Sequence, residues 1–150
     1  FYQDARKTDV SFSMKGRLIG GCMDCLVTLV GTKFDKVREF NKKYADDGII
    51  WLMESCDLNV FDVRRALWQM ENAGWFENVK GFVFGRPLNG VSMLNLNKYD
   101  ALLEPVKKYN VPVVMDADFG HFDPMIPVMM GSIAEFDVRG NNMIVGYEVK

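Results

Sequence analysis

The chain has 150 residues, of which 49% are hydrophobic and 25% are charged, a composition that fits one globular domain and excludes disordered and fibrous classes. The formal net charge of -2 argues against a nucleic-acid partner, because a surface that binds nucleic acid needs clustered lysine and arginine. No apolar run approaches the ~20 residues of a membrane-spanning helix, so we expect no membrane segment.

The opening of the chain is polar, and we interpret residues 1–15 as an incoming linker to a single domain over residues 16–150. The sequence begins with Phe1 and carries no signal-peptide pattern, so we expect further sequence upstream. Arg17 to Gly21 predicts a short strand that ends in a glycine turn. A short helix is predicted to follow over residues 22–30.

The middle of the chain alternates between apolar runs of strand length and amphipathic helices. Buried strands are predicted at residues 48–53, 80–85 and 111–115. Helices are predicted at residues 35–45, 60–73 and 98–109. Asp35 and Asn59 are suitable amino-terminal caps for the first two of these helices. Strands that alternate with helices predict right-handed βαβ units and a parallel sheet.

The end of the chain has a different pattern. Residues 132–138 and 143–149 alternate apolar and polar side chains on either side of a glycine- and asparagine-rich turn at residues 139–142. This pattern is typical of an antiparallel hairpin. The predicted fold class is therefore α/β, with a parallel central sheet plus an antiparallel hairpin.

Chemically useful side chains follow three of the predicted strands. Glu54 ends the first, Arg86 follows the second, and His121 lies shortly after the third. Because ligands bind beyond the carboxyl ends of parallel strands, these three residues are expected at one edge of the sheet. The residues therefore form one candidate site.

Each of these side chains has a catalytic and a structural interpretation. His121 could act as a general base near neutral pH, or could fix its loop by hydrogen bonding. Glu54 could orient the histidine, or cap the following helix, although Asp57 and Asn59 are better placed for capping. Arg86 could bind a substrate carboxylate or form a buried ion pair.

A nucleophile is harder to find. Ser55 adjoins Glu54, but neighbouring side chains of a strand point to opposite faces, and no Gly-x-Ser-x-Gly motif is present. The cysteines Cys22, Cys25 and Cys56 allow a thiol nucleophile paired with histidine, a CxxC redox site, or a zinc site. No second CxxC and no histidine pair accompanies them, so we favour reduced thiols, with no metal and no cofactor.

Several motifs occur in a fixed order along the chain. They are Arg17-Leu-Ile-Gly-Gly21, Leu29-Val-Gly-Thr32, Gly48-Ile-Ile-Trp-Leu-Met-Glu54, Arg64-Arg-Ala-Leu-Trp-Gln-Met70, Ala73-Gly74, Val79-Lys-Gly-Phe-Val-Phe-Gly-Arg86, and Phe119-Gly-His121 with Pro124, Pro127 and Gly131. From about Gly16 onward their order and spacing resemble the second domain of LD-carboxypeptidases (muramoyltetrapeptide carboxypeptidases) and of the related microcin C self-immunity peptidases.

The resemblance implies the smaller, swivelling β/β/α-type domain of a two-domain serine peptidase, with Glu54 and His121 as triad residues. The nucleophilic serine would lie in an amino-terminal domain of the same polypeptide, so this chain is expected to be inactive alone. Family members release terminal D-alanine from murein tetrapeptides in the cytoplasm during wall recycling. They use no metal and are commonly homodimers. The immunity branch instead cleaves acyl-sulfamoyl adenylates.

The sequence departs from the family pattern at one position near the substrate. The family commonly has asparagine after the Gly-Gly turn, and Cys22 stands there in this chain. We expect Cys22 and Arg86 to face the substrate. The substrate itself stays open between a murein peptide and an adenylate conjugate, and a non-catalytic module that binds cell-wall peptides is a further alternative.

Overall fold

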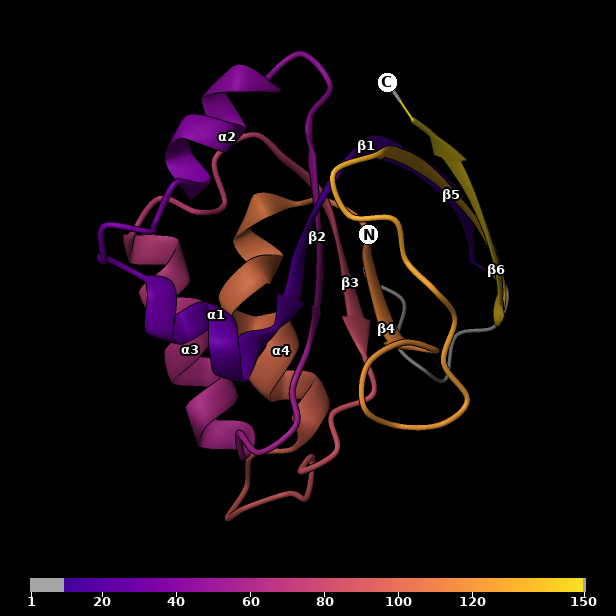
Figure 1. Ribbon diagram of the computed structural model, residues 1–150. Helices are drawn as coiled ribbons and strands as arrows, with labels where there is room; N and C mark the ends of the chain where they lie inside the picture. Colours follow the sequence, from indigo (N-terminus) through magenta and orange to yellow (C-terminus); the bar gives the residue numbers. More distant parts are fainter. Residues whose placement is uncertain (1–9, 150) are drawn as a thin grey trace.

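A six-stranded sheet in the order β4-β3-β2-β1-β5-β6 forms the centre of the computed structural model, which describes residues 10–149 (Figure 1). The strands are β1 (Ser11–Cys22), β2 (Ile49–Glu54), β3 (Val79–Gly85), β4 (Val113–Ala117), β5 (Ile133–Arg139) and β6 (Asn142–Glu148). The helices are α1 (Met23–Leu29), α2 (Val37–Lys43), α3 (Val60–Asn72) and α4 (Lys98–Val106), the last extended by a 3₁₀ turn, Lys107–Tyr109.

The sheet has a parallel half and an antiparallel half, and β1 belongs to both. Its carboxyl-terminal part pairs in parallel with β2, from Arg17 opposite Ile49 to Cys22 opposite Glu54. Strands β2, β3 and β4 continue the parallel half. The amino-terminal part of β1 pairs antiparallel with β5, which forms the hairpin with β6. The predicted α/β class, with its parallel centre and antiparallel hairpin, is confirmed.

The helices lie together on one side of the parallel strands, and the hairpin lies on the other side (Figure 1). Strand β2 is buried along its whole length. Alternate side chains of β2 point to opposite faces, so Trp51 and Met53 join the helix-covered core while Ile50 and Leu52 join a second core. A continuous apolar run is therefore what this strand requires.

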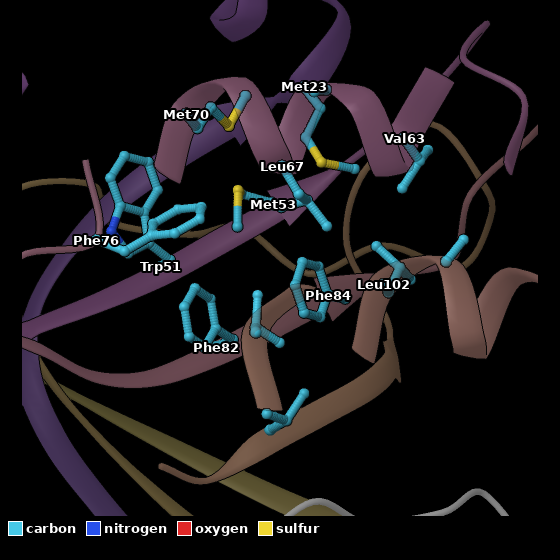
Figure 2. Close-up of a cluster of buried hydrophobic side chains, with 14 of the residues drawn as sticks. Met23, Trp51, Met53, Val63, Leu67, Met70, Phe76, Phe82, Phe84 and Leu102 are labelled. Atoms are coloured by element: carbon cyan, nitrogen blue, oxygen red, sulfur yellow. The ribbon is translucent and has the colours of Figure 1, made fainter. Parts of the chain in front are cut away.

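The helix-covered core consists of aromatic, methionine and aliphatic side chains from the sheet and the helices (Figure 2). Trp51 stacks on Trp75, with ring centroids 5.7 Å apart, and meets Phe76 edge-on at 5.5 Å. Helix α3 contributes the stripe Val60, Val63, Ala66, Leu67 and Met70, and its predicted cap is confirmed because the Asn59 side chain accepts hydrogen bonds from two backbone amides. Burial of each such large apolar side chain contributes about 1.5–3 kcal/mol.

The second core lies between the parallel strands and the hairpin. Met14 and Leu18 of β1 pack there with Phe136 and Val138 of β5 and with Phe119 from the segment after β4. That segment, residues 118–132, is called the rim loop below. It connects β4 to β5 and passes over the second face of the sheet (Figure 1).

The first strand is longer than expected. Residues 11–15 were expected in a linker, but they form the first part of β1, where they pair with β5. Phe12 and Met14 point inward while Ser11, Ser13 and Lys15 are exposed, so the alternation of this stretch is that of a half-buried strand. The rest of the expected linker, residues 1–9, lies outside the described residues.

The other predicted elements are present, with shifted ends. The helix expected at 35–45 is α2, and its cap position is occupied by Lys36 rather than Asp35. Asp35 still accepts a hydrogen bond from the backbone amide of Val37. No helix within residues 10–149 is both long and apolar enough to cross a membrane.

Candidate active site

Glu54 and His121 meet at the carboxyl end of the parallel strands. The Nδ1 atom of His121 lies 2.9 Å from Oε2 of Glu54, which is hydrogen-bond distance. Glu54 is 5% exposed at the end of β2, whereas the His121 side chain is 48% exposed. The pair therefore has a fixed, buried carboxylate and an accessible imidazole.

Glu54 ends β2 and His121 follows β4, and β3 lies between these two strands in the sheet. Strand β3 ends at Gly85, and a Cβ atom at that position would lie 2.9 Å from Glu54 Cβ and 2.5 Å from the carbonyl oxygen of Phe119. Both distances are too short for real atoms. A glycine at the end of β3 therefore lets the rim loop cross over this strand and reach Glu54.

The residue before the histidine is subject to the same constraint. Gly120 has a φ of +105°, a conformation that glycine adopts readily and other residues rarely. A Cβ atom there would lie 2.7 Å from Cγ and 2.9 Å from Oε2 of Glu54. The backbone of Gly120 thus packs directly on the carboxylate that contacts the next side chain.

The electrostatics of the pair favour a charged imidazole. The hydrogen bond to Glu54 and the negative charge of that carboxylate raise the pKa of His121 above its ordinary value. Asp24 and Asp57 add to this rise through their charges. A proton that arrives on His121 is therefore stabilised by the residue that orients the ring.

Arg86 ties the rim loop to the end of β3. Its guanidinium donates hydrogen bonds to the backbone carbonyls of Phe122, Asp123 and Pro124, and it forms an ion pair with Asp118 at 3.2 Å. Arg86 also lines a cavity of about 340 Å³ together with Pro87, Leu88, Gly90, Val91, Lys98 and Phe122. Its donors are thus largely engaged by the segment that presents His121, while the residue still borders open space.

A second set of hydrogen bonds joins β4 to helix α4. Asp116 has a φ of +56°, and the register between β3 and β4 shifts at this point. Its carboxylate accepts hydrogen bonds from Lys98 Nζ and Tyr99 Oη, each at 2.6 Å. A bulge of this kind bends a strand and redirects the residues that follow it. Helix α4 therefore fixes the direction in which the chain leaves the sheet toward His121.

Cys22 lies beside Glu54, because the two residues are partners in the parallel register of β1 and β2. The Cys22 thiol donates a hydrogen bond to Asp24 at 3.3 Å, and burial raises the pKa of the thiol to about 12. The sulfur atom, a carboxylate oxygen of Glu54 and a ring nitrogen of His121 lie within 4.8 Å of one another. The cysteine is therefore a direct neighbour of the pair.

Asp24 holds the segment that follows Glu54. Its carboxylate accepts backbone hydrogen bonds from Cys56, Asp57 and Leu58 at 3.0, 2.8 and 3.1 Å. Burial raises the pKa of Asp24, but these hydrogen bonds outweigh burial and lower it overall. The first turn of α1 thus fixes the loop after β2.

The other sequence candidates take no part in the hydrogen bond between Glu54 and His121. Cys25 is exposed on α1, and the three cysteines are free thiols. Ser55 is buried, and its hydroxyl has no hydrogen-bond partner among the described residues. Within residues 10–149, no hydrogen bond joins a serine or cysteine to His121. Sequence reasoning missed the spacing roles of Gly85 and Gly120, for which a glycine at a strand end and one just before the sole histidine were the available signals.

Comparison with known proteins identifies one family and a set of solved structures. The model of the LD-carboxypeptidase C-terminal domain family matches residues 15–136. The microcin C7 self immunity protein MccF, in the wild-type apo state, aligns over 94% of this chain and 40% of its own, with 22% sequence identity and a TM-score of 0.74. Muramoyltetrapeptide carboxypeptidase from Oxalobacter formigenes aligns over 94% of this chain and 47% of its own, with 21% identity and a TM-score of 0.65.

An MccF-like protein from Streptococcus pneumoniae, solved in complex with AMP, aligns over 95% of this chain and 43% of its own, with 21% identity and a TM-score of 0.64. The chain therefore spans less than half of the length of these solved structures. No curated protein sequence matches the chain. At these identities the structural likeness shows a shared fold.

Proposed function

The chain belongs to the LD-carboxypeptidase C-terminal domain family, and we propose that it supplies the histidine and glutamate of a serine-type carboxypeptidase. The observation that carries the proposal is the 2.9 Å contact between His121 Nδ1 and Glu54 Oε2. A buried carboxylate on one ring nitrogen fixes the orientation of the imidazole and stabilises its protonated form. The other ring nitrogen is left for a substrate-side group.

In the proposed reaction, an external serine attacks the carbonyl carbon of the scissile amide while His121 Nε2 takes the hydroxyl proton. The Glu54 carboxylate stabilises the imidazolium that forms. The imidazolium then protonates the departing amine, which leaves an acyl-enzyme. His121 next takes a proton from water, whose oxygen attacks the ester, and returns that proton to the serine. No net proton or electron is gained or lost.

We assign the nucleophile to an amino-terminal domain of the same polypeptide. The solved relatives are about twice as long as this chain or longer, which leaves room for such a domain. Cys22 is a poor substitute, because a thiol with a pKa of about 12 is protonated at neutral pH. This chain alone is therefore expected to be inactive, and we propose that the whole enzyme is a cytoplasmic homodimer.

The proposed substrate is a murein tetrapeptide, cleaved at an L,D amide bond with release of terminal D-alanine. Muramoyltetrapeptide carboxypeptidase among the structural neighbours supports this assignment. We propose that Cys22 faces the substrate, since it adjoins Glu54 at the edge of the sheet. For Arg86, the donors already bound to the rim loop favour a positioning role, while its border on the 340 Å³ cavity keeps a substrate contact open.

A second candidate is cleavage of acyl-sulfamoyl adenylates. It is favoured by the higher TM-score to MccF, which has been solved in complex with aspartyl sulfamoyl adenosine. The same relay would serve either substrate, so the choice depends on residues around it. Offering both substrates to one enzyme preparation separates the two candidates, and binding of murein peptide without turnover would instead indicate a non-catalytic binding module.

The test joins this chain to its natural amino-terminal half and measures release of D-alanine from an L,D-tetrapeptide. We expect Glu54→Gln to lower kcat/KM by about 10⁴-fold and His121→Ala to lower it by at least as much, as losses of triad residues do in other serine hydrolases. Glu39→Gln, which changes an exposed carboxylate on α2, is the matched control and should keep full activity. Wild-type turnover by either triad variant would contradict the proposal.

A further inference from the structure

The side chains around the imidazole form a second kind of site. Cys22, Glu54 and His121 offer a sulfur, an oxygen and a nitrogen atom, all within 4.8 Å of one another. They come from three separated parts of the chain, namely the end of β1, the end of β2 and the rim loop. We propose that these three side chains bind a zinc ion, which would compete with the proton relay.

The donor set matches the chemistry of zinc. Zinc takes thiolate, imidazole and carboxylate ligands in tetrahedral geometry, with bonds of about 2.0–2.3 Å. In such a tetrahedron, two ligand atoms are about 3.3–3.8 Å apart. The three ligand atoms of this site lie at most 4.8 Å apart, so the longest of these distances must shorten by about 1 Å for zinc to bind. In the proposed site, rotation of the half-exposed His121 ring or of the Cys22 side chain would supply that movement.

The surroundings also favour a cation. Glu54 is buried at the site, and Asp24 accepts a hydrogen bond from the Cys22 thiol. Both Asp24 and Asp57 are close enough to act electrostatically on His121. Coordination requires the thiolate form of Cys22, so zinc displaces the thiol proton to solvent. The exposed side of His121 leaves a fourth position for water.

The inhibitory consequence rests on the proposed function, whereas the site itself does not. A zinc ion held by His121 and Glu54 would occupy the nitrogen and the carboxylate that the relay needs. Zinc would then inhibit the whole enzyme through the cysteine that replaces the family asparagine. Cys22→Asn should remove this inhibition, measured as the ratio of the variant's own activity with and without zinc.

The experiment titrates this chain with Co²⁺, which takes the place of zinc and reports its ligands by absorbance, and then displaces it with Zn²⁺. We expect a thiolate-to-cobalt charge-transfer band that is abolished in Cys22→Ser and Cys22→Asn. In Glu54→Gln the apparent affinity should fall by at least about tenfold. Cys25→Ser, which changes an exposed thiol on α1, is the matched control and should keep the band.

Circular dichroism confirms that each variant is folded, and two different replacements of Cys22 guard against one that fails to fold. A missing band in the wild-type chain would overturn the proposal. A band that survives Cys22→Ser but is lost in Cys25→Ser or Cys56→Ser would also overturn it, because the metal would then lie elsewhere. Since the readout is absorbance, an inactive peptidase would not affect this result, and a failed titration would leave the peptidase proposal standing.

Discussion

The helix-covered core and the rim loop are built from similar residue types but are held in different ways. In the core, Trp51, Trp75, Phe82 and Phe84 are fully buried, and they stack in two pairs, Trp51 on Trp75 and Phe82 on Phe84. In the rim loop, Phe119 is buried in the second core, but five other large apolar side chains stay about half exposed: Phe122, Met125, Ile126, Met129 and Met130. The core is therefore fixed by packing, whereas the rim loop beyond Phe119 depends on a small number of polar contacts and on close backbone contacts.

The candidate relay has one residue in each region. Glu54 ends a strand of the core layer, and His121 is carried by the rim loop. Their meeting depends on Gly85 and Gly120, which remove the side chains that would otherwise keep the two regions apart. We infer that changes in the core alter chiefly stability, and that changes in the rim loop alter chiefly activity.

The largest expected effect is a loss of stability caused by a change in the helix-covered core. Trp51→Ala removes a ring that stacks on Trp75 and meets Phe76 edge-on, and it should lower the free energy of unfolding by about 3–5 kcal/mol. Urea denaturation of the two proteins measures the difference. Trp68→Ala is the matched control, because Trp68 is 63% exposed on α3 and its loss should cost less than about 0.5 kcal/mol. Equal costs for both variants would contradict a packing-based core.

The next largest effect is a loss of activity caused by a change in the rim loop. Gly120→Ala places a methyl group against the Glu54 side chain and strains a positive φ, so the imidazole moves away from the carboxylate. In the enzyme completed with the proposed amino-terminal domain, we expect kcat/KM to fall by about 100-fold, as a misplacement of about 1 Å can cause.

Gly131→Ala controls for the backbone strain in that experiment. Gly131 has a φ of +82° in the same loop, but a Cβ atom there would meet nothing within 4 Å. This variant should retain most of its activity. If both alanine variants lose activity equally, the contact between Gly120 and Glu54 is not what positions His121.

The difference between the two regions also explains what the sequence could predict. The core elements carry their own local signals: the apolar run of β2, the stripe and Asn59 cap of α3, and the turn of the hairpin. Such signals depend only on the solvent exposure and backbone conformation of the segment itself. They can therefore be interpreted without knowing which other elements the segment packs against. The meeting of Glu54 and His121 at one edge was likewise expected from parallel strands that share a direction.

The remaining features depend on tertiary neighbours. Nothing local to Cys22 indicates that β1 pairs with β2, which is the pairing that places the thiol beside Glu54. The bulge at Asp116 depends on Lys98 and Tyr99 from a helix that precedes it by many residues. The early start of β1 did have a local signal, the alternation of Phe12 and Met14 with polar residues, but the polar composition of that stretch was interpreted as a linker.

The smallest expected effect is the pH dependence of the rim loop, where stability and activity should change in opposite directions. Because folding raises the pKa of His121, the stabilisation from its contact with Glu54 is fully present below the unfolded-state pKa of about 6.5 and is lost as the pH rises through the higher folded value. Under the proposed mechanism, activity of the completed enzyme should instead appear over that same rise, because only a neutral imidazole can accept a proton from the proposed serine.

Thermal unfolding and kcat/KM, both measured between about pH 5 and pH 9, test this opposition. His121→Gln should lose the part of the stability change that the imidazole causes, while Trp68→Ala should keep it. Because His121 is exposed, solvent screens the contact and the stability change is expected to be small beside that of Trp51→Ala. If wild-type stability rises relative to His121→Gln across this range, the imidazolium is not stabilised by Glu54, and the two regions are not coupled through this pair.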